Sequence, residues 1–223
     1  MGAISYQEGA MNNAFRSEPD PGSSISGAGN GQVDSDRRAG DRYRTVWRIA
    51  KVVRDGDAGL WRVRNISNRG MMLAADVPIA VGERLEIALS DTVVVAGKVV
   101  WSDDGRCGVA FDDEVDVAHM LKQLAAEQRA TGYRQPRLEV HTLAQAVTDR
   151  VTTSIELVDL SQNGAGFIHD GHLEVGKELE LVLGKDIRRK AIVRWSRGTR
   201  GGLWLTQPLD RADLESIRRF AGS

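Results

Sequence analysis

Two short groups of polar residues in the N-terminal half have types and spacings that suit ligand binding. The first is a pair of arginines four residues apart, Arg38 and Arg42, with Arg37 beside them. A guanidinium group donates two parallel hydrogen bonds to a phosphate or to the O6 and N7 edge of guanine, and it also stacks on purine faces. This segment therefore suits an anionic, purine-containing ligand, with a solvated surface cluster of arginines as the alternative.

The second group is Asn65-x-Ser67-x-x-Gly70. Residues two apart on a β-strand project to the same face, so Asn65 and Ser67 are expected to present an amide and a hydroxyl side by side. Gly70 lacks a Cβ and permits a positive φ or a close approach between the backbone and a ligand. Such residues are also frequent in ordinary turns. We expect this group to form the fixed wall of a site that the arginine segment covers.

The elements that position these groups are predicted to be short antiparallel strands. Runs of apolar and β-branched residues alternate with turns at Gly56, Gly82 and Gly105, which is typical of a barrel or sandwich. We expect Trp101, at the end of one run, to pack in the core, and Trp195 to do the same later in the chain. The expected strands are Thr45–Val53, Leu60–Ile66, Gly70–Ala74, Arg84–Ser90, Val93–Trp101 and Gly108–Phe111.

An amphipathic helix is expected after these strands. Apolar residues recur at helical spacing from Val117 to Ala125, behind Asp113 and Asp116, and the pattern ends at Gly132. A comparable pattern closes the chain, where acidic residues precede spaced apolar ones. The residues of this second pattern are Asp210, Asp213, Leu214, Ile217, Phe220 and Ala221.

An internal repeat shows that the chain contains two copies of one fold. A shift of 94 residues places Asn65 on Asp159 and Ser67 on Ser161, and the same shift holds without a gap as far as Gly202. We therefore predict a mostly β protein of two tandem six-stranded antiparallel barrels, each followed by a C-terminal α-helix. The expected layout is a disordered tail at 1–36, a first domain at 37–131 and a second domain at 132–223.

These motifs, in this order, resemble the two-part signature of PilZ domains. Arg38-Ala39-Gly40-Asp41-Arg42 precedes the first strand, Asn65-x-Ser67-x-x-Gly70 ends the second, and Gly108-Val109-Ala110-Phe111 follows Trp101 by seven residues. The resemblance implies a six-stranded barrel with a helix that binds the second messenger cyclic di-GMP. The site residues that it implies are Arg37, Arg38, Arg42, Asn65, Ser67 and Gly70.

The second copy departs from this signature. Asp159-x-Ser161-x-x-Gly164 is present, but no two arginines lie four apart between Arg129 and Arg137. If Arg137 takes the place of Arg42, Tyr133 falls where Arg38 stands in the first copy. The second domain is thus predicted to be degenerate, and the sequence leaves open whether Arg134 and Arg137 give it a weaker site.

Composition narrows the possible functions. The formal net charge is −1 and aromatic residues make up 5% of the chain, which disfavours a DNA- or RNA-binding barrel. The single cysteine, Cys107, suits a reducing compartment, and no stretch has the pattern of a signal peptide or a membrane span, so we expect a cytoplasmic protein without membrane insertion. His169 and His172, expected in a loop, have no partners at metal-binding spacing.

The function predicted from the sequence is therefore a receptor for cyclic di-GMP that transmits binding to a protein partner by a conformational change. It has no expected cofactor or metal and no catalytic residues. The alternative is a degenerate PilZ-like adaptor that binds protein without the nucleotide. The partner, the output process, the oligomeric state, and the choice between one ligand and an intercalated pair remain open at this stage.

Overall fold

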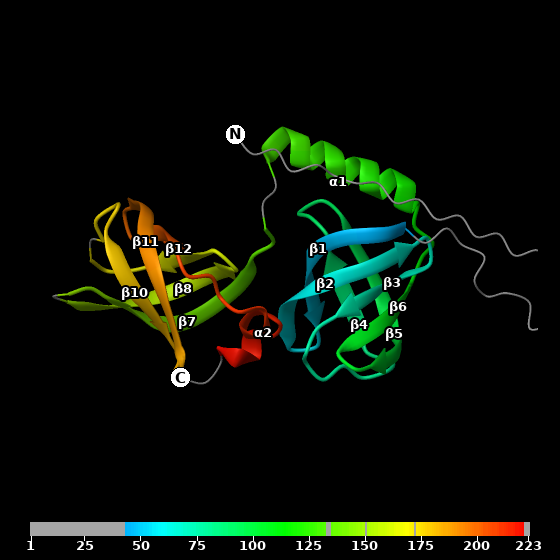
Figure 1. Ribbon diagram of the computed structural model, residues 1–223, viewed down its shortest axis with the longest axis horizontal. Helices are drawn as coiled ribbons and strands as arrows, with labels where there is room; N and C mark the ends of the chain where they lie inside the picture. The colour runs from blue at the N-terminus through cyan, green and yellow to red at the C-terminus, as the bar shows by residue number, and fades with distance from the viewer. Residues whose placement is uncertain (1–42, 133–134, 150, 172, 221–223) are drawn as a thin grey trace, which may run out of the picture. The chain divides into compact units, whose positions relative to one another are not determined.

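The short alternating strands form two closed β-barrels in tandem, as Figure 1 shows for this computed structural model. The structure describes residues 43–132, 135–149, 151–171 and 173–220, and the predicted tail at 1–36 lies outside them. Both barrels are antiparallel and six-stranded, which confirms the predicted fold class. Closure pairs every strand on both sides, so neither barrel has a free sheet edge.

The first barrel has the strand order β1-β2-β3-β6-β5-β4. Side chains alternate between its interior and solvent, and the interior is filled by large apolar residues such as Trp61, Leu73 and Ile87. The turn glycine Gly56 has a φ of 61°, a value that L-residues with a Cβ rarely adopt. The strands are β1 (Tyr43–Arg54), β2 (Asp57–Ser67), β3 (Gly70–Ala74), β4 (Arg84–Ala88), β5 (Val94–Asp103) and β6 (Arg106–Phe111).

The helix α1 (Val117–Thr131) follows this barrel, close to its predicted bounds. Its N-cap is Asp116, whose carboxylate accepts a hydrogen bond from the backbone N–H of His119 and satisfies one of the unpaired N–H groups of the first turn. Val117, Met120 and Leu124 are buried in the apolar cluster of the first barrel. The apolar face of α1 thus packs on the barrel that precedes it.

The second barrel repeats this arrangement in the order β10-β11-β12-β9-β8-β7. Its core is built around Phe167 and a set of leucines that includes Leu157 and Leu181. The strands are β7 (Leu138–Val147), β8 (Thr152–Ser161), β9 (Gly164–Ile168), β10 (Glu178–Leu183), β11 (Ile187–Arg197) and β12 (Arg200–Leu205).

The C-terminal element differs in form from the predicted single helix. The chain makes a four-residue helix α2 (Arg211–Leu214) and a separate 3-10 turn η1 (Ile217–Arg219). Asp213, expected ahead of the helix, lies inside α2 and is buried against Arg189, whose guanidinium lies 3.2 Å from it. Ser216 interrupts the helical pattern because its extended backbone caps η1.

β-Bulges occur at matching places in the two barrels. The β2–β3 register shifts between Val63 and Asn65, and the β5–β6 register shifts between Val99 and Trp101. The second barrel has shifts between Leu157 and Asp159 and between Val193 and Trp195. A bulge adds one residue to a strand and reverses which face the following side chains point to. The bulges therefore decide which side chains reach the outer face.

Candidate functional site

The β2–β3 turn of the first barrel carries the predicted polar group. The Ser67 hydroxyl donates a hydrogen bond to the carbonyl oxygen of Gly70 at 3.1 Å, which closes the turn. Since its hydrogen is used in this way, the Ser67 oxygen is left as an acceptor for an external N–H donor.

The bulge directs Asn65 outward. Val63 and Ile66 are both buried in the barrel interior, so the extra residue between them puts Asn65 and Ser67 on the outer face. Their side chains thus share one face, as predicted, but simple alternation from Val63 would have pointed Asn65 into the core. The bulge is what makes Asn65 accessible.

The packing of neighbouring strands requires a glycine at position 70. Its φ is not positive, and a Cβ at this position would overlap the carbonyl oxygen of Val109 on β6. The glycine therefore allows the backbones of β3 and β6 to approach closely. Within the described residues, this neighbouring strand accounts for the glycine without a ligand.

A row of paired residues runs from Asn65 across the outer face. Asn65 pairs with Met72 on β3, Met72 with Gly108 on β6, and Gly108 with Trp101 on β5. A Cβ on Gly108 would overlap the indole of Trp101, so the ring lies flat over the glycine backbone. The site thus has an aromatic end in line with Asn65.

The prediction that Trp101 and Trp195 belong to the core is wrong. They are 42% and 44% exposed, because the bulges after Val99 and Val193 turn both rings outward. The signal that could have revealed this role is the repeat itself, in which tryptophan and glycine recur together at Trp101–Gly108 and Trp195–Gly202.

The arginine segment immediately precedes, in the sequence, the strand that borders this row. Arg37, Arg38 and Arg42 lie outside the described residues, and β1 begins directly after them. In β1, Tyr43 pairs with Ile66 and Arg44 with Asn65. The predicted arginine pair is therefore tethered, through a few residues of chain, to the strand position opposite Asn65.

The second barrel has an arginine at the corresponding sequence position, and the structure describes its contact. Leu138 pairs with Leu160, as Tyr43 does with Ile66, so Arg137 holds the position of Arg42. Its guanidinium lies 2.5 Å from a carboxylate oxygen of Asp159. Tyr133 and Arg134 lie outside the described residues.

Asp159 is held on its other side by the backbone. It accepts a hydrogen bond of 3.1 Å from the N–H of Gly166, and a Cβ on Gly166 would overlap the carboxylate. In the first barrel the paired residue is Met72, and the polar residue is the neutral Asn65. Asp159 thus neutralises Arg137 internally, whereas Asn65 carries no charge to do so.

A surface cavity of about 620 Å³ lies over the same face of the second barrel. Ser161 hydrogen-bonds to the carbonyl oxygen of Gly164 at 3.3 Å, as Ser67 does to Gly70. Trp204 is 44% exposed there, and the guanidinium of Arg194 lies 5.5 Å from its ring centroid. In the repeat, Trp204 corresponds to Ala110 of the first barrel and Arg194 corresponds to Val100. The two faces therefore share a backbone plan but differ in charge and bulk.

Among the residues that the structure describes, the titratable groups elsewhere show no second reactive site. His169, expected in a loop with His172, is 3% exposed and packs against Phe167, while His172 lies outside the described residues. Burial raises the pKa of the Cys107 thiol to about 11, so it is protonated and unreactive at neutral pH. Among the residues with described positions, no three His, Cys, Asp or Glu side chains gather as metal ligands would.

The comparisons with known proteins agree with the two-copy plan. The family model for the PilZ domain matches the chain twice, at residues 36–127 and 132–223. None of the described helices combines the length and apolar character required to cross a membrane. No curated protein sequence matches the chain.

Similar solved structures include PlzA of Borreliella burgdorferi in complex with c-di-GMP, with 12% identity and a TM-score of 0.34 over 78% of this chain and 87% of that chain. MotI/DgrA of Bacillus subtilis, an inhibitor of motility, is 10% identical with a TM-score of 0.31 over 75% and 91% of the two chains. YcgR of Escherichia coli in complex with c-di-GMP is 14% identical with a TM-score of 0.26 over 70% and 74%.

Proposed function

Because the chain belongs to the PilZ domain family, we propose that it is a receptor for cyclic di-GMP whose first barrel binds the ligand. The proposed domains are 37–131 and 132–223, after a tail at 1–36. The protein acts by binding, with no catalytic step, no cofactor and no metal. The proposed binding residues are Arg37, Arg38, Arg42, Asn65, Ser67 and Gly70.

One observation carries this proposal: the outward row that begins opposite Arg44 and continues from Asn65 to Trp101. It combines a polar end, bordered by the strand that follows the arginine segment in the sequence, with an exposed aromatic ring at the far end. A cyclic dinucleotide has this division, since its phosphates need cationic donors and its guanines need both hydrogen bonds and a stacking surface.

Four polar residues of the site have separate chemical tasks in this proposal. The Ser67 oxygen accepts from a guanine N–H, and the Asn65 amide matches the mixed donors and acceptors of the base edge. Arg38 and Arg42 close over the ligand with bidentate contacts to phosphate or to guanine O6 and N7. We add Trp101 to the site, as a ring on which a guanine stacks.

The output follows from the position of the arginine segment. Ligand binding fixes residues 37–44 against the outer face of β2, and this ordering changes the surface that a protein partner contacts. The partner is a protein and not a nucleic acid, in keeping with the nearly balanced charge of the chain.

The adaptor alternative is favoured by one feature of the second barrel. There the only arginine described before β7 at this face, Arg137, is already paired with Asp159, and exposed Trp195 and Trp204 flank the cavity. Exposed aromatic residues with a stacked arginine are typical of protein interfaces. We therefore assign the second barrel a contact role and the first barrel the ligand.

Calorimetry of the full chain with cyclic di-GMP tests this assignment. The Asn65→Ala/Ser67→Ala variant should bind at least about tenfold more weakly, a change of about 1.4 kcal/mol. The matched control is Asp159→Ala/Ser161→Ala, which removes the same pair from the second barrel and should bind like wild type. A wild-type chain that does not bind cyclic di-GMP, while GMP and other nucleotides also fail, would leave only the adaptor role.

A further inference from the structure

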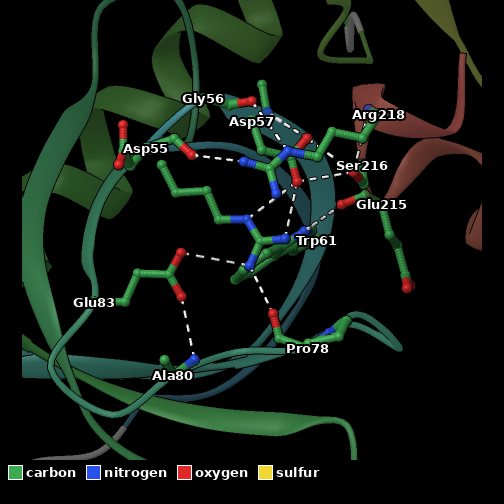
Figure 2. Close-up of polar contacts among 12 residues, drawn as sticks. Asp55, Gly56, Asp57, Trp61, Pro78, Ala80, Glu83, Glu215, Ser216 and Arg218 are labelled. Atoms are coloured by element: carbon green, nitrogen blue, oxygen red, sulfur yellow. Dashed lines mark hydrogen bonds and ion pairs between the residues drawn. The ribbon is translucent and has the colours of Figure 1, made fainter. Parts of the chain in front are cut away.

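The C-terminal segment Arg211–Phe220, here called the strap, follows the second barrel but docks on the first. The indole N–H of Trp61 in β2 donates to the carbonyl oxygen of Glu215 at 2.8 Å. The backbone N–H of Asp76, just after β3, donates to the Glu215 carboxylate at 2.5 Å. Figure 2 shows Ser216 and Arg218 directed at the β1–β2 hairpin, and the backbone carbonyl of Glu215 directed at Trp61.

The hairpin itself supplies further contacts. The Ser216 hydroxyl lies 2.8 Å from both carboxylate oxygens of Asp57, which also accepts from Arg54 at 2.9 Å. Arg218 donates to the carbonyl oxygens of Gly56 at 3.2 Å and Asp55 at 3.1 Å. The strap therefore contacts two backbone carbonyl groups of this hairpin and its buried carboxylate.

Docking of the strap explains why a glycine and an outward leucine stand next to each other in β2. A Cβ on Gly59 would overlap the carbonyl oxygen of Glu215, so the glycine leaves room for the strap backbone. Leu60, whose neighbours Gly59 and Trp61 face inward, is buried in the apolar cluster that also contains Leu214 and Phe220. An outward leucine next to a glycine is thus part of a built docking surface.

The Glu215 side chain of the docked strap is almost completely shielded from water. Glu215 is 2% exposed, burial raises its pKa, and the charged groups that face it are Arg62, Arg211 and Asp76. The Nε of Arg62 is buried without a hydrogen-bond partner among the described residues. A buried N–H without a partner is unfavourable, and burial of apolar groups such as Leu60 offsets this cost.

Both the strap and the ligand motif act on β2. The strap holds its first half, from Asp57 to Trp61, and the ligand motif lies at its other end, at Asn65 and Ser67. We propose that strap docking and ligand binding are positively coupled through the β1–β2 ribbon; this coupling rests on the proposed ligand site. The strap thereby makes the second barrel respond to the ligand of the first.

The physical basis is the ordering of one ribbon from its two ends. Ligand bound at Asn65 and Ser67 ties the start of β1 to the end of β2, which reduces the motion of the hairpin that the strap contacts. A strap that docks on an already ordered hairpin loses less conformational entropy, so each event favours the other.

Hydrogen exchange provides a direct measure of strap docking. The Asp76 amide and the Trp61 indole N–H donate to the strap, so their exchange in the full chain reports its release. In the ligand-free protein both should be protected, and saturating cyclic di-GMP should slow both by about fivefold or more. The Leu203 amide in the second barrel serves as the internal reference.

Two variants loosen the strap by different routes. Ser216→Ala/Arg218→Ala removes polar contacts without touching either core. Gly59→Ala pushes on the strap backbone and also on the Trp61 indole nitrogen, so the Asp76 amide is its reporter. Both variants should release the Asp76 amide, and both should weaken cyclic di-GMP binding by the same factor that the ligand adds to protection, because coupling is reciprocal. Gly171→Ala, where a Cβ meets nothing within 4 Å, is the matched control and should change neither quantity.

The outcomes separate the two proposals. Fast exchange of both reporters in the ligand-free wild type would contradict docking of the strap on the first barrel. Ligand binding that leaves their exchange unchanged, together with wild-type affinity in the loosened variants, overturns the coupling and leaves the proposed function intact. A wild type that shows protected reporters but no affinity for cyclic di-GMP overturns the proposed function and the coupling together.

Discussion

In the first barrel the outer-face row consists of Asn65, Met72, Gly108 and Trp101, and in the second barrel the same row consists of Asp159, Gly166, Gly202 and Trp195. The backbone, the bulges and the tryptophan–glycine stack are common to both. The difference is concentrated at the first two positions of the row, Asn65 and Met72 against Asp159 and Gly166.

That difference changes what the arginine can do. In the second barrel a carboxylate fits over Gly166 and pairs with Arg137, so its guanidinium is satisfied within the protein. In the first barrel a neutral amide stands beside the bulkier Met72, so an arginine arriving there meets no charge on that residue. A repeat can thus keep its scaffold while one acid-for-amide change removes the internal carboxylate partner, as the proposed function requires.

The largest expected effect tests this contrast directly. Arg42→Ala should weaken cyclic di-GMP binding more than tenfold, since it removes a charge-assisted contact worth about 2 kcal/mol or more. Arg137→Ala should stay within about twofold of wild type, because the exposed ion pair with Asp159 is worth about 1 kcal/mol or less and involves no ligand. Calorimetry on full chains measures both.

The controls refine this prediction. Arg42→Lys should weaken cyclic di-GMP binding almost as much as Arg42→Ala, because an ammonium group cannot make a bidentate contact. Arg129→Ala removes an exposed arginine at the end of α1 and should bind normally. Equal losses for Arg42→Ala and Arg137→Ala would show that both barrels bind, and the asymmetry between them would be wrong.

A smaller contrast lies in the turn glycines. A Cβ on Gly70 overlaps the carbonyl oxygen of Val109, whereas a Cβ on Gly164 lies 3.0 Å from that of Leu203. We expect Gly70→Ala to lower the free energy of unfolding by about 2 kcal/mol and Gly164→Ala by about 1 kcal/mol or less. Urea unfolding followed by barrel-specific amide signals measures each. Equal costs would mean that β6 and β12 can shift equally.

A third contrast concerns a complementary exchange in the two cores. Leu73 pairs with Cys107 in the first barrel, and Phe167 pairs with Gly201 in the second, where a Cβ on Gly201 would overlap the Phe167 ring. Leu73→Phe alone should cost about 1–3 kcal/mol through overpacking. Adding Cys107→Gly should recover at least about 1 kcal/mol, and a double-mutant cycle in denaturant measures the coupling. Strict additivity would show that the two positions do not share volume.

The sequence predicted the barrels because alternation, turn glycines and the 94-residue repeat all report local geometry. It misplaced Trp101 and Trp195 because a bulge adds a residue without a strong local signal, and one added residue reverses the face. It also missed the strap, whose contacts join residues such as Trp61 and Glu215 that lie far apart in the chain. Long-range contacts of this kind leave only indirect traces, such as Gly59 beside the outward Leu60.

The smallest expected effect compares the β1–β2 hairpin with its counterpart, in which the 94-residue shift places Val151 at the position of Asp57. Burial acts to raise the pKa of Asp57, but hydrogen bonds from Arg54 and Ser216 lower it below its ordinary value of 3.8. A carboxylate with a lowered pKa contributes stability above its unfolded pKa, and loses that contribution as the pH falls through its folded pKa. Asp57→Asn should therefore release the strap at pH 6, with faster Trp61 indole exchange than wild type, and the two proteins should converge only as the pH falls through the lowered pKa of Asp57, below 3.8. Glu215, whose pKa burial raises, has the opposite sign: it favours docking below its ordinary pKa and loses this contribution as the pH rises. Glu215→Gln should thus match wild type near pH 4 and exchange no faster at pH 7. An Asp57→Asn effect that persists unchanged below the folded pKa of Asp57 would show that the carboxylate acts through its shape and not through its charge.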